Sequence, residues 1–221
     1  MWCASVFALT LLCSLSSPSS AEAAPAWESV GLIDGVAVER AEVAGSSLMA
    51  FRGQIEVPVS LAKLIYVFRR PEERRHWVDR YHSHQTIEKT QRSELYRIRF
   101  RLPPLISDRD YVLFSKAELD AERREIRVMI GSVEDERAPV NDCCVRAEVR
   151  RTFYRFTMLS PTRTRLEVEV HTDPKGSLPS WLVNLIQRSW PAKTLTSLVA
   201  RAEQVNRSDP SIEEWMQSLT P

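Results

Sequence analysis

Few side chains in this sequence have the type and spacing that metal binding or catalysis requires. His82 and His84 stand two residues apart, so on a strand they would share one face, and they are the best candidates for metal ligands. A third ligand does not stand at a suitable spacing, and histidines on the protein surface are the simpler interpretation. We therefore expect no metal site.

Two aspartates are the remaining candidates for general acid or base chemistry. Asp110 begins an expected strand and Asp142 stands among turn residues, where aspartate usually shapes the backbone. The sequence contains no G-x-S-x-G, no H-E-x-x-H and no phosphate-binding loop. We expect a protein that is not an enzyme and that carries no cofactor.

The cysteines do not predict a disulfide framework. Cys3 and Cys13 belong to the N-terminal leader, and the other two, Cys143 and Cys144, are adjacent. A bond between neighbouring cysteines would be strained, and a metal site would need further ligands close by.

Composition narrows the class of protein. With 221 residues the chain is long enough for one domain with a real core. Its 30 basic and 29 acidic residues leave almost no net charge, so nucleic acid is not an expected partner. Arginine is abundant at 97–101 and 146–155, where it alternates with apolar residues as on the solvent face of a strand. We expect a monomer.

The first 23 residues have the outline of a secretory signal peptide. An apolar run at 6–15 precedes small polar residues at 16–20 and a small-x-small site at 21–23. Because no Lys or Arg precedes the run, a misassigned start codon and an uncleaved anchor are the alternatives. We expect cleavage after Ala23 and export to the periplasm or the extracellular space. Residues 24–206 would then form the main domain and 207–221 a tail.

The elements that would position the polar residues are mostly strands. Asp34-Gly35 between two alternating segments predicts a hairpin at 27–43, and Pro58 ends a third strand at 48–57. Strands resume at about residue 85, and at 96–102 apolar residues alternate strictly with Arg. Further strands are expected at 110–119, 124–133, 145–158 and 163–172.

Helices are expected at three places. Ser60 is a suitable N-cap for a first helix, and Pro71 precedes a second short helix at 72–78. From 179 to 204 apolar residues recur at helical spacing in one long amphipathic helix. Pro191 lies inside that pattern and should kink or locally break the helix. A small amphipathic helix is expected after Pro210.

The order of these elements predicts the fold class. Three strands, two short helices, about six strands and a long helix indicate an α+β protein with an antiparallel sheet. A sheet of about nine twisted strands curls, and a long helix can lie in its concave face.

Three segments carry a family resemblance: ERRHW at 73–77, SDRDYV at 107–112 and DPKGSLPSWLVN at 173–184. In their order and spacing the chain from 27 to 204 resembles a START domain, the lipid-transfer fold named after the steroidogenic acute regulatory protein. The resemblance implies a helix-grip fold, in which a curved sheet wraps around the C-terminal helix. One hydrophobic ligand would lie between them.

The resemblance also implies which residues have functional roles. In such domains the loop at 103–108 and the C-terminal helix form a lid through which the ligand passes. The expected ligand-binding residues are Tyr96, Ile98, Phe100, Tyr111, Leu113, Ser115, Val128, Ile130, Leu182, Leu185 and Ile186. The expected gate residues are Leu105, Ile106, Arg109 and Pro191.

The chain departs from the steroid-binding members at two positions. Those members have an Arg at the position of Ser115 and an acid at the position of Tyr96, so their buried charge pair is absent here. The sequence therefore disfavours a cholesterol-like ligand and favours one that requires fewer polar contacts inside the protein.

We expect the protein to bind one lipid or other hydrophobic molecule and to contact membranes transiently. Transfer between membranes is left open by the sequence. One alternative is a cyclase-like enzyme that acts on a hydrophobic substrate in the same cavity, as in related helix-grip folds. Another is a sensor or scaffold whose partner contacts the tail helix.

Overall fold

The computed structural model describes residues 25–140 and 142–219 of the chain, so the predicted signal peptide lies outside the described residues. The strands are β1 Glu28–Ile33, β2 Val36–Ala41, β3 Ala50–Val57, β4 Tyr81–Lys89, β5 Ser93–Phe100, β6 Asp108–Asp120, β7 Glu125–Ser132, β8 Cys144–Arg146, β9 Glu148–Ser160 and β10 Arg163–Asp173. The helices are α1 Leu61–Arg69, α2 Pro71–Trp77, α3 Ser180–Gln187, α4 Trp190–Gln204 and α5 Pro210–Ser218.

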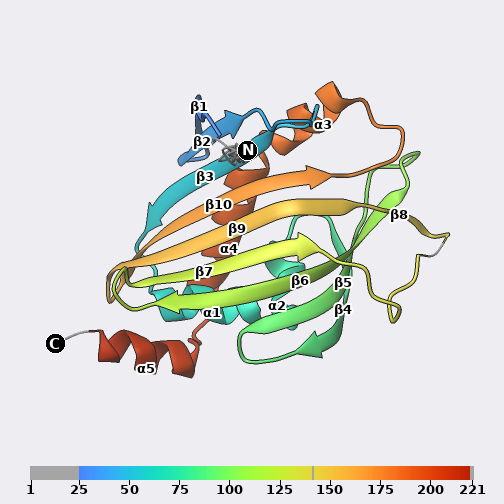
Figure 1. Ribbon diagram of the computed structural model, residues 1–221. Helices are drawn as coiled ribbons and strands as arrows, with labels where there is room; N and C mark the ends of the chain where they lie inside the picture. Colours follow the sequence, from blue (N-terminus) through green and yellow to red (C-terminus); the bar gives the residue numbers. More distant parts are fainter. Residues whose placement is uncertain (1–24, 141, 220–221) are drawn as a thin grey trace, which may run out of the picture.

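Within the described residues, the strands form one sheet in the order β1-β2-β3-β10-β9-β7-β6-β5-β4, with neighbours antiparallel (Figure 1). This arrangement confirms the α+β class and the curved antiparallel sheet. The short strand β8 lies off this path and pairs with β6 in parallel, with Cys144 opposite Asp108. The strand predicted at 145–158 is therefore two strands. They separate at Ala147, whose N–H donates to the carbonyl of Asp110 at 2.9 Å.

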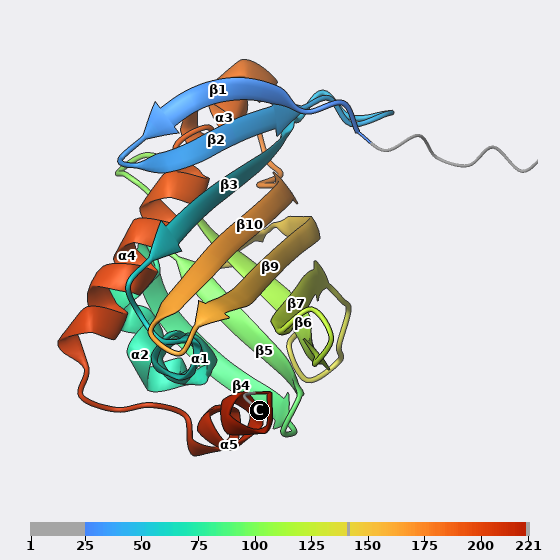
Figure 2. The same ribbon diagram turned by 90° about the vertical axis from the view of Figure 1, so that its left-hand side faces the viewer.

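The sheet curls around α4, which crosses its concave side, while α1 and α2 lie at one end of that side (Figure 2). Helix α4 packs on β2, β3 and β10 and on the two short helices. Its Leu195 and Leu198 are fully buried in the main core together with Phe156 of β9 and Leu166 of β10. This is the helix-grip arrangement expected from the sequence.

The long C-terminal helix is broken, as Pro191 predicted. Helix α3 ends at Gln187 and α4 begins at Trp190, with Pro191 in the first turn of α4. In a continuous helix the proline ring would clash with the carbonyl four residues earlier, which is that of Gln187. The first turn of a new helix tolerates proline because its missing N–H would have no partner there.

Helix α3 has an orientation that the amphipathic pattern did not predict. Two polar side chains point into the protein: Asn184 Oδ1 accepts from the N–H of Met49 at 2.9 Å, and Gln187 Nε2 donates to Thr172 Oγ1 at 2.9 Å. Val183 is buried beside them, whereas Leu185 and Ile186 face outward, and Leu185 is 59% exposed. Hydrogen bonds to strand ends thus decide which face of α3 is buried.

The arginines of the convex face are paired with carboxylates. Arg97 binds Asp110 at 2.6 Å, Arg99 binds Asp108 at 2.7 Å, and Arg155 binds Glu167 at 3.0 Å. The Arg-rich segments are therefore the solvent face of strands whose charges are matched.

The two adjacent cysteines correct one expectation. Cys143 and Cys144 are joined by a disulfide bond, with the chain turning at 142–143 just before β8. None of the helices in the described part of the chain is both long and apolar enough to cross a membrane.

Candidate functional site

Six of the expected ligand-binding residues lie together on the concave face. Tyr96 pairs across strands with Leu113, and Ile98 pairs with Tyr111, so their side chains point to the same side of β5 and β6. With Phe100 and Ile130 they belong to a second apolar cluster, which borders the main core through Ile130 and Val78. Strand alternation alone places these residues on one face, and the structure shows them in contact.

The other expected ligand-binding residues are placed differently. Ser115 lies on the same face, and its hydroxyl donates to the carbonyl of Glu94 at 3.3 Å. Val128 is buried in the main core, and Leu182 on α3 is partly buried. Leu185 and Ile186 lie on the outer surface of α3, away from the second cluster, because the buried side of α3 carries Val183 and Gln187.

A buried ion pair beside this cluster was missed by the sequence reasoning. Arg74 on α2 binds Glu94 on β5 at 2.6 Å, and both side chains are at most 10% exposed. Thr86 Oγ1 donates to the same carboxylate at 2.9 Å. The steroid-type pair is absent at positions 96 and 115, but a different pair lies inside the protein. Glu94 continues the inward series of Tyr96 and Ile98, and this alternation was a signal that could have revealed it.

His84 completes this buried polar cluster and is not a surface residue. A bulge between Tyr81 and Ser83 shifts the register, so His84 pairs with Ile98 on the inward side of β4. Its Nδ1 lies 2.6 Å from Nη1 of Arg74, and its Nε2 lies 3.1 Å from Oε1 of Glu94. Because Arg74 can only donate, these contacts fit a neutral imidazole that carries its proton on Nε2.

The protonation states agree with this geometry. Burial by itself would raise the pKa of Glu94, but the hydrogen bond from His84 and the charge of Arg74 outweigh it and lower that pKa to about 2. Burial lowers the pKa of His84 below its usual range, and the charge of Arg74 acts in the same direction. The cluster therefore holds Arg74 as a cation, Glu94 as an anion and His84 as a neutral ring.

The cluster is not arranged to hold a metal ion. The guanidinium of Arg74 lies against the ring of His84, where a bound cation would be repelled. No group of three or more potential metal-ligating His, Cys, Asp or Glu side chains is found among residues 25–140 and 142–219. Asp110 is buried and paired with Arg97 and Arg146, so its role is structural.

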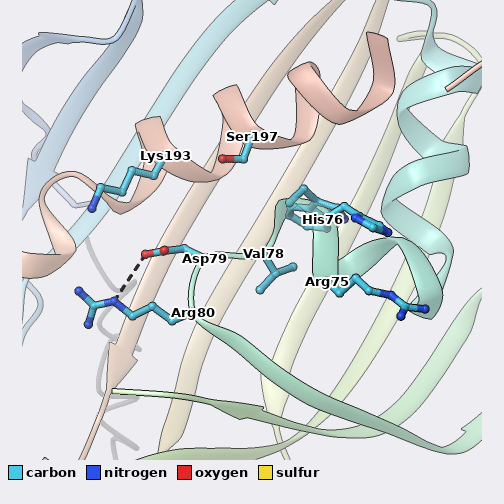
Figure 3. A pocket seen from close by; sticks show the side chains of 8 residues that line it. Arg75, His76, Val78, Asp79, Arg80, Lys193 and Ser197 are labelled. Carbon is cyan, nitrogen blue, oxygen red and sulfur yellow. Dashed lines mark ion pairs between the residues drawn. The ribbon is translucent and has the colours of Figure 1, made fainter. Parts of the chain in front are cut away.

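A surface pocket of about 320 Å³ lies between α4 and the turn that joins α2 to β4 (Figure 3). Lys193 and Ser197 come from α4, and Asp79 and Arg80 come from the turn, where they form an ion pair of 3.8 Å. Trp77 and Val78 also line it, and both pack against the apolar clusters inside the protein. The pocket thus adjoins the interior, although none of the expected ligand or gate residues lines it.

The expected gate residues lie in three places: Leu105 and Ile106 in the 103–108 loop, Arg109 at the start of β6, and Pro191 buried in the first turn of α4. The side chain of Arg109 is buried and donates to the carbonyls of Pro174 at 2.9 Å and Lys175 at 3.0 Å, and also to that of Ser107. It therefore ties the 103–108 loop to the segment that leads into α3. Leu105 at the tip of this loop is fully exposed, and Ile106 is partly buried.

Comparisons with known proteins find a matching family and solved structures with the same fold. A family model described as the START domain matches residues 16–207. The STAR-related lipid transfer protein of Xanthomonas axonopodis (fragment 25–204) is 23% identical with a TM-score of 0.71, covering 80% of this chain and 99% of that chain. Human StAR-related lipid transfer protein 5 is 22% identical with a TM-score of 0.74, covering 80% of this chain and 86% of that chain. At these identities the shared feature is the fold. A comparison with curated proteins finds no match.

Proposed function

The chain belongs to the START domain family, and from this premise we propose that it binds a single lipid-like molecule between the concave face of the sheet and α4. The observation that carries the proposal is the second apolar cluster. Phe100, Tyr111 and Ile130 in this cluster remain only partly buried, although they lie on the inner side of the sheet. A concave apolar surface that the helices cover incompletely is suited to an apolar ligand.

The size of the hydrophobic effect explains why such a surface is needed. Exposing an acyl chain to water costs about 0.8 kcal/mol per CH₂, or roughly 13 kcal/mol for about sixteen of them. A carrier must replace those contacts with its own side chains. The apolar residues of β5, β6 and β7 on the concave face supply them, while the paired charges of the convex face remain in water.

Lipid uptake tests this proposal directly. The purified protein, incubated with a total lipid extract and examined by native mass spectrometry, is expected to carry one lipid molecule. Leu113→Trp adds bulk to the second cluster and should reduce uptake. Phe114→Trp is the matched control, because Phe114 is the next residue on β6 and lies 42% exposed on the opposite face. Protein that takes up no lipid, or equal uptake by both variants, would contradict the proposal.

We further propose that the 103–108 loop and the segment before α3 open together to admit the lipid. Arg109 supports this because it holds the two segments through backbone carbonyls. The outward apolar residues of α3, Trp181, Leu185 and Ile186, and the exposed Leu105 would contact the membrane during exchange.

The lipid exchange rate tests the gate. Arg109→Lys keeps the charge but cannot reach three carbonyls, so exchange with vesicles should be faster than in the wild type and should increase with vesicle concentration. Arg101→Lys, an exposed position before the same loop, serves as the control. An unchanged rate in Arg109→Lys would show that this contact does not limit exchange.

A further inference from the structure

Three polar groups inside the protein lack hydrogen-bond partners among the described residues. No hydrogen bond engages the hydroxyl of Tyr96 or Tyr154, and although each residue is only 5% exposed, neither hydroxyl oxygen is completely shielded. The indole N–H of Trp77 is fully buried without an acceptor. A buried polar group without a partner costs stability, and hydroxyls that keep a little accessible surface inside a protein can donate to a molecule bound there.

These three groups border the same part of the interior. The guanidinium of Arg74 lies 4.5 Å from the centre of the Tyr96 ring, and its charge also acts on the phenol of Tyr154. Trp77 follows Arg74 by three residues on α2, which places the two side chains on one side of the helix. Phe68 contacts both Trp77 and Tyr154, with ring centres 5.8 and 4.8 Å away. A molecule held beside Arg74 would therefore lie next to Tyr96 and Tyr154, with Trp77 one helical turn further along α2.

The charges in this region are already matched by the protein. Glu94 accepts from Arg74, His84 and Thr86, so the carboxylate is fully engaged. A phosphate or carboxylate that took Arg74 as its partner would leave Glu94 buried without its cation, which is strongly unfavourable. Arg109 is the other buried arginine on this side of the sheet, and it donates hydrogen bonds to the carbonyls of Ser107, Pro174 and Lys175.

The unpaired groups have a common chemical preference. The indole N–H can only donate a hydrogen bond. Each phenol can also donate, because burial keeps it un-ionised: burial raises the pKa of Tyr96 to about 12. Hydroxyl, ester and carbonyl oxygens accept such protons without bringing a charge into the interior.

We propose that the ligand is a neutral lipid whose polar end carries uncharged oxygen acceptors, such as a diacylglycerol, and not a lipid with a phosphate or carboxylate group. The proposal rests on the proposed function, because it names the ligand class of the same site. Tyr96, Tyr154 and Trp77 donate to the polar end of the lipid, and the Arg74–Glu94 pair excludes anionic head groups.

A competition experiment tests the ligand class. The protein is incubated with equal amounts of dioleoylglycerol, dioleoylphosphatidylglycerol and oleate, and the bound species are counted by native mass spectrometry. All three carry the oleoyl chain, and dioleoylglycerol and dioleoylphosphatidylglycerol carry two each, so the ratio of these two lipids reports the polar end alone. We expect dioleoylglycerol to be preferred about ten-fold or more. The double variant Tyr96→Phe/Tyr154→Phe should lose most of this preference while still binding lipid.

Tyr66→Phe is the matched control. Tyr66 is a buried tyrosine of α1 whose hydroxyl contacts Arg207, so removing that hydroxyl should leave the ratio unchanged. Equal or stronger binding of the anionic lipids, or a ratio unchanged in the double variant, would overturn the ligand class and leave the proposed function intact. If none of the three lipids binds and a total lipid extract gives no bound molecule either, the proposed function itself fails.

Discussion

At the scale of single residues, Glu94 of β5 joins α2 and β4 inside the protein. Its carboxylate binds Arg74 at 2.6 Å and also accepts from His84 and Thr86. Glu94→Gln would leave Arg74 as a buried cation without a counter-charge, and we expect it to lower the free energy of unfolding by about 3–5 kcal/mol. Urea denaturation at pH 7 measures this change. Glu88 lies on the neighbouring strand β4, and Glu88→Gln, which alters only its exposed pair with Arg137, should cost less than about 1 kcal/mol.

The pH dependence of stability gives the same prediction an independent check. Because the pKa of Glu94 is lowered from 4.5 to about 2, its contribution is fully present above about pH 4.5 and is lost as the pH falls toward 2. The difference in stability between the wild type and Glu94→Gln should therefore narrow below pH 4.5. A difference that stayed constant down to pH 2 would mean that the charge of Glu94 is not what stabilises the fold.

Sequence patterns predicted the positions of only some residues that line the interior of the sheet. Alternation predicted that Tyr96, Ile98 and Tyr111 share the inner face, because side chains in a strand point to opposite sides in turn. It could not place His84, since the bulge at 81–83 adds a residue to β4. The partner of Glu94 was also out of reach, because Arg74 stands 20 residues earlier on another element. Contacts between elements depend on the packing of the whole fold.

At the scale of elements, the approach of α4 to β3 depends on a glycine. A Cβ at Gly53 would lie 2.7 Å from Cβ of Pro191 and 3.0 Å from Cγ1 of Val36. Cβ of Pro191 is fixed by the backbone of α4, so it cannot move without shifting the helix, and Val36 is fully buried, which leaves its methyl group little room to turn. Gly53→Ala should therefore lower the free energy of unfolding by about 1–3 kcal/mol, as overpacked cores do. Thermal or urea denaturation measures the loss.

Gly131 provides the control for this prediction. It also lies on a strand, β7, but a Cβ there would meet no atom within 4 Å. Gly131→Ala should change stability by no more than about 0.5 kcal/mol. If the two variants were equally stable, the close contact between α4 and β3 would not be a determinant of the fold.

The two C-terminal helices show how far periodicity alone can predict an element. The break near Pro191 followed from a local clash, so the sequence was sufficient to predict it. The orientation of α3 did not follow, because its Asn184 and Gln187 find backbone and side-chain partners on strands and loops far away in the chain. Such bonds outweigh the burial of Leu185 and Ile186, which stay exposed.

At the scale of the whole molecule, the order of the elements was sufficient to predict the sheet and the helix that it wraps around. Antiparallel neighbours joined by short turns leave few other arrangements. The parallel strand β8 was not predictable, because it pairs with β6 across a long connection. The sequence also left open the role of the segment after residue 206. The structure shows where its helix, α5, packs.

Helix α5 packs on the domain itself. Its Ile212 is 4% exposed in the main core, and Asp209 before it binds Arg69 of α1 at 3.0 Å. The N–H of Asp209 also donates to the carbonyl of Ala62 at 3.1 Å. A helix whose apolar face is used in this way is a structural part of the molecule and is not free to bind a partner through that face.

Removing α5 should therefore destabilise the protein without abolishing lipid uptake. Ile212→Ala should lower the free energy of unfolding by about 2–5 kcal/mol, and deletion of residues 211–221 by at least as much. Glu214→Ala, on the exposed side of the same helix, should change it by less than about 0.5 kcal/mol. Both destabilised proteins should still take up lipid at temperatures where they are folded, because α5 contacts α1 and lies outside the second apolar cluster. Wild-type stability in the deletion variant would instead mean that the tail is independent of the domain, and the sensor or scaffold alternative would regain its support.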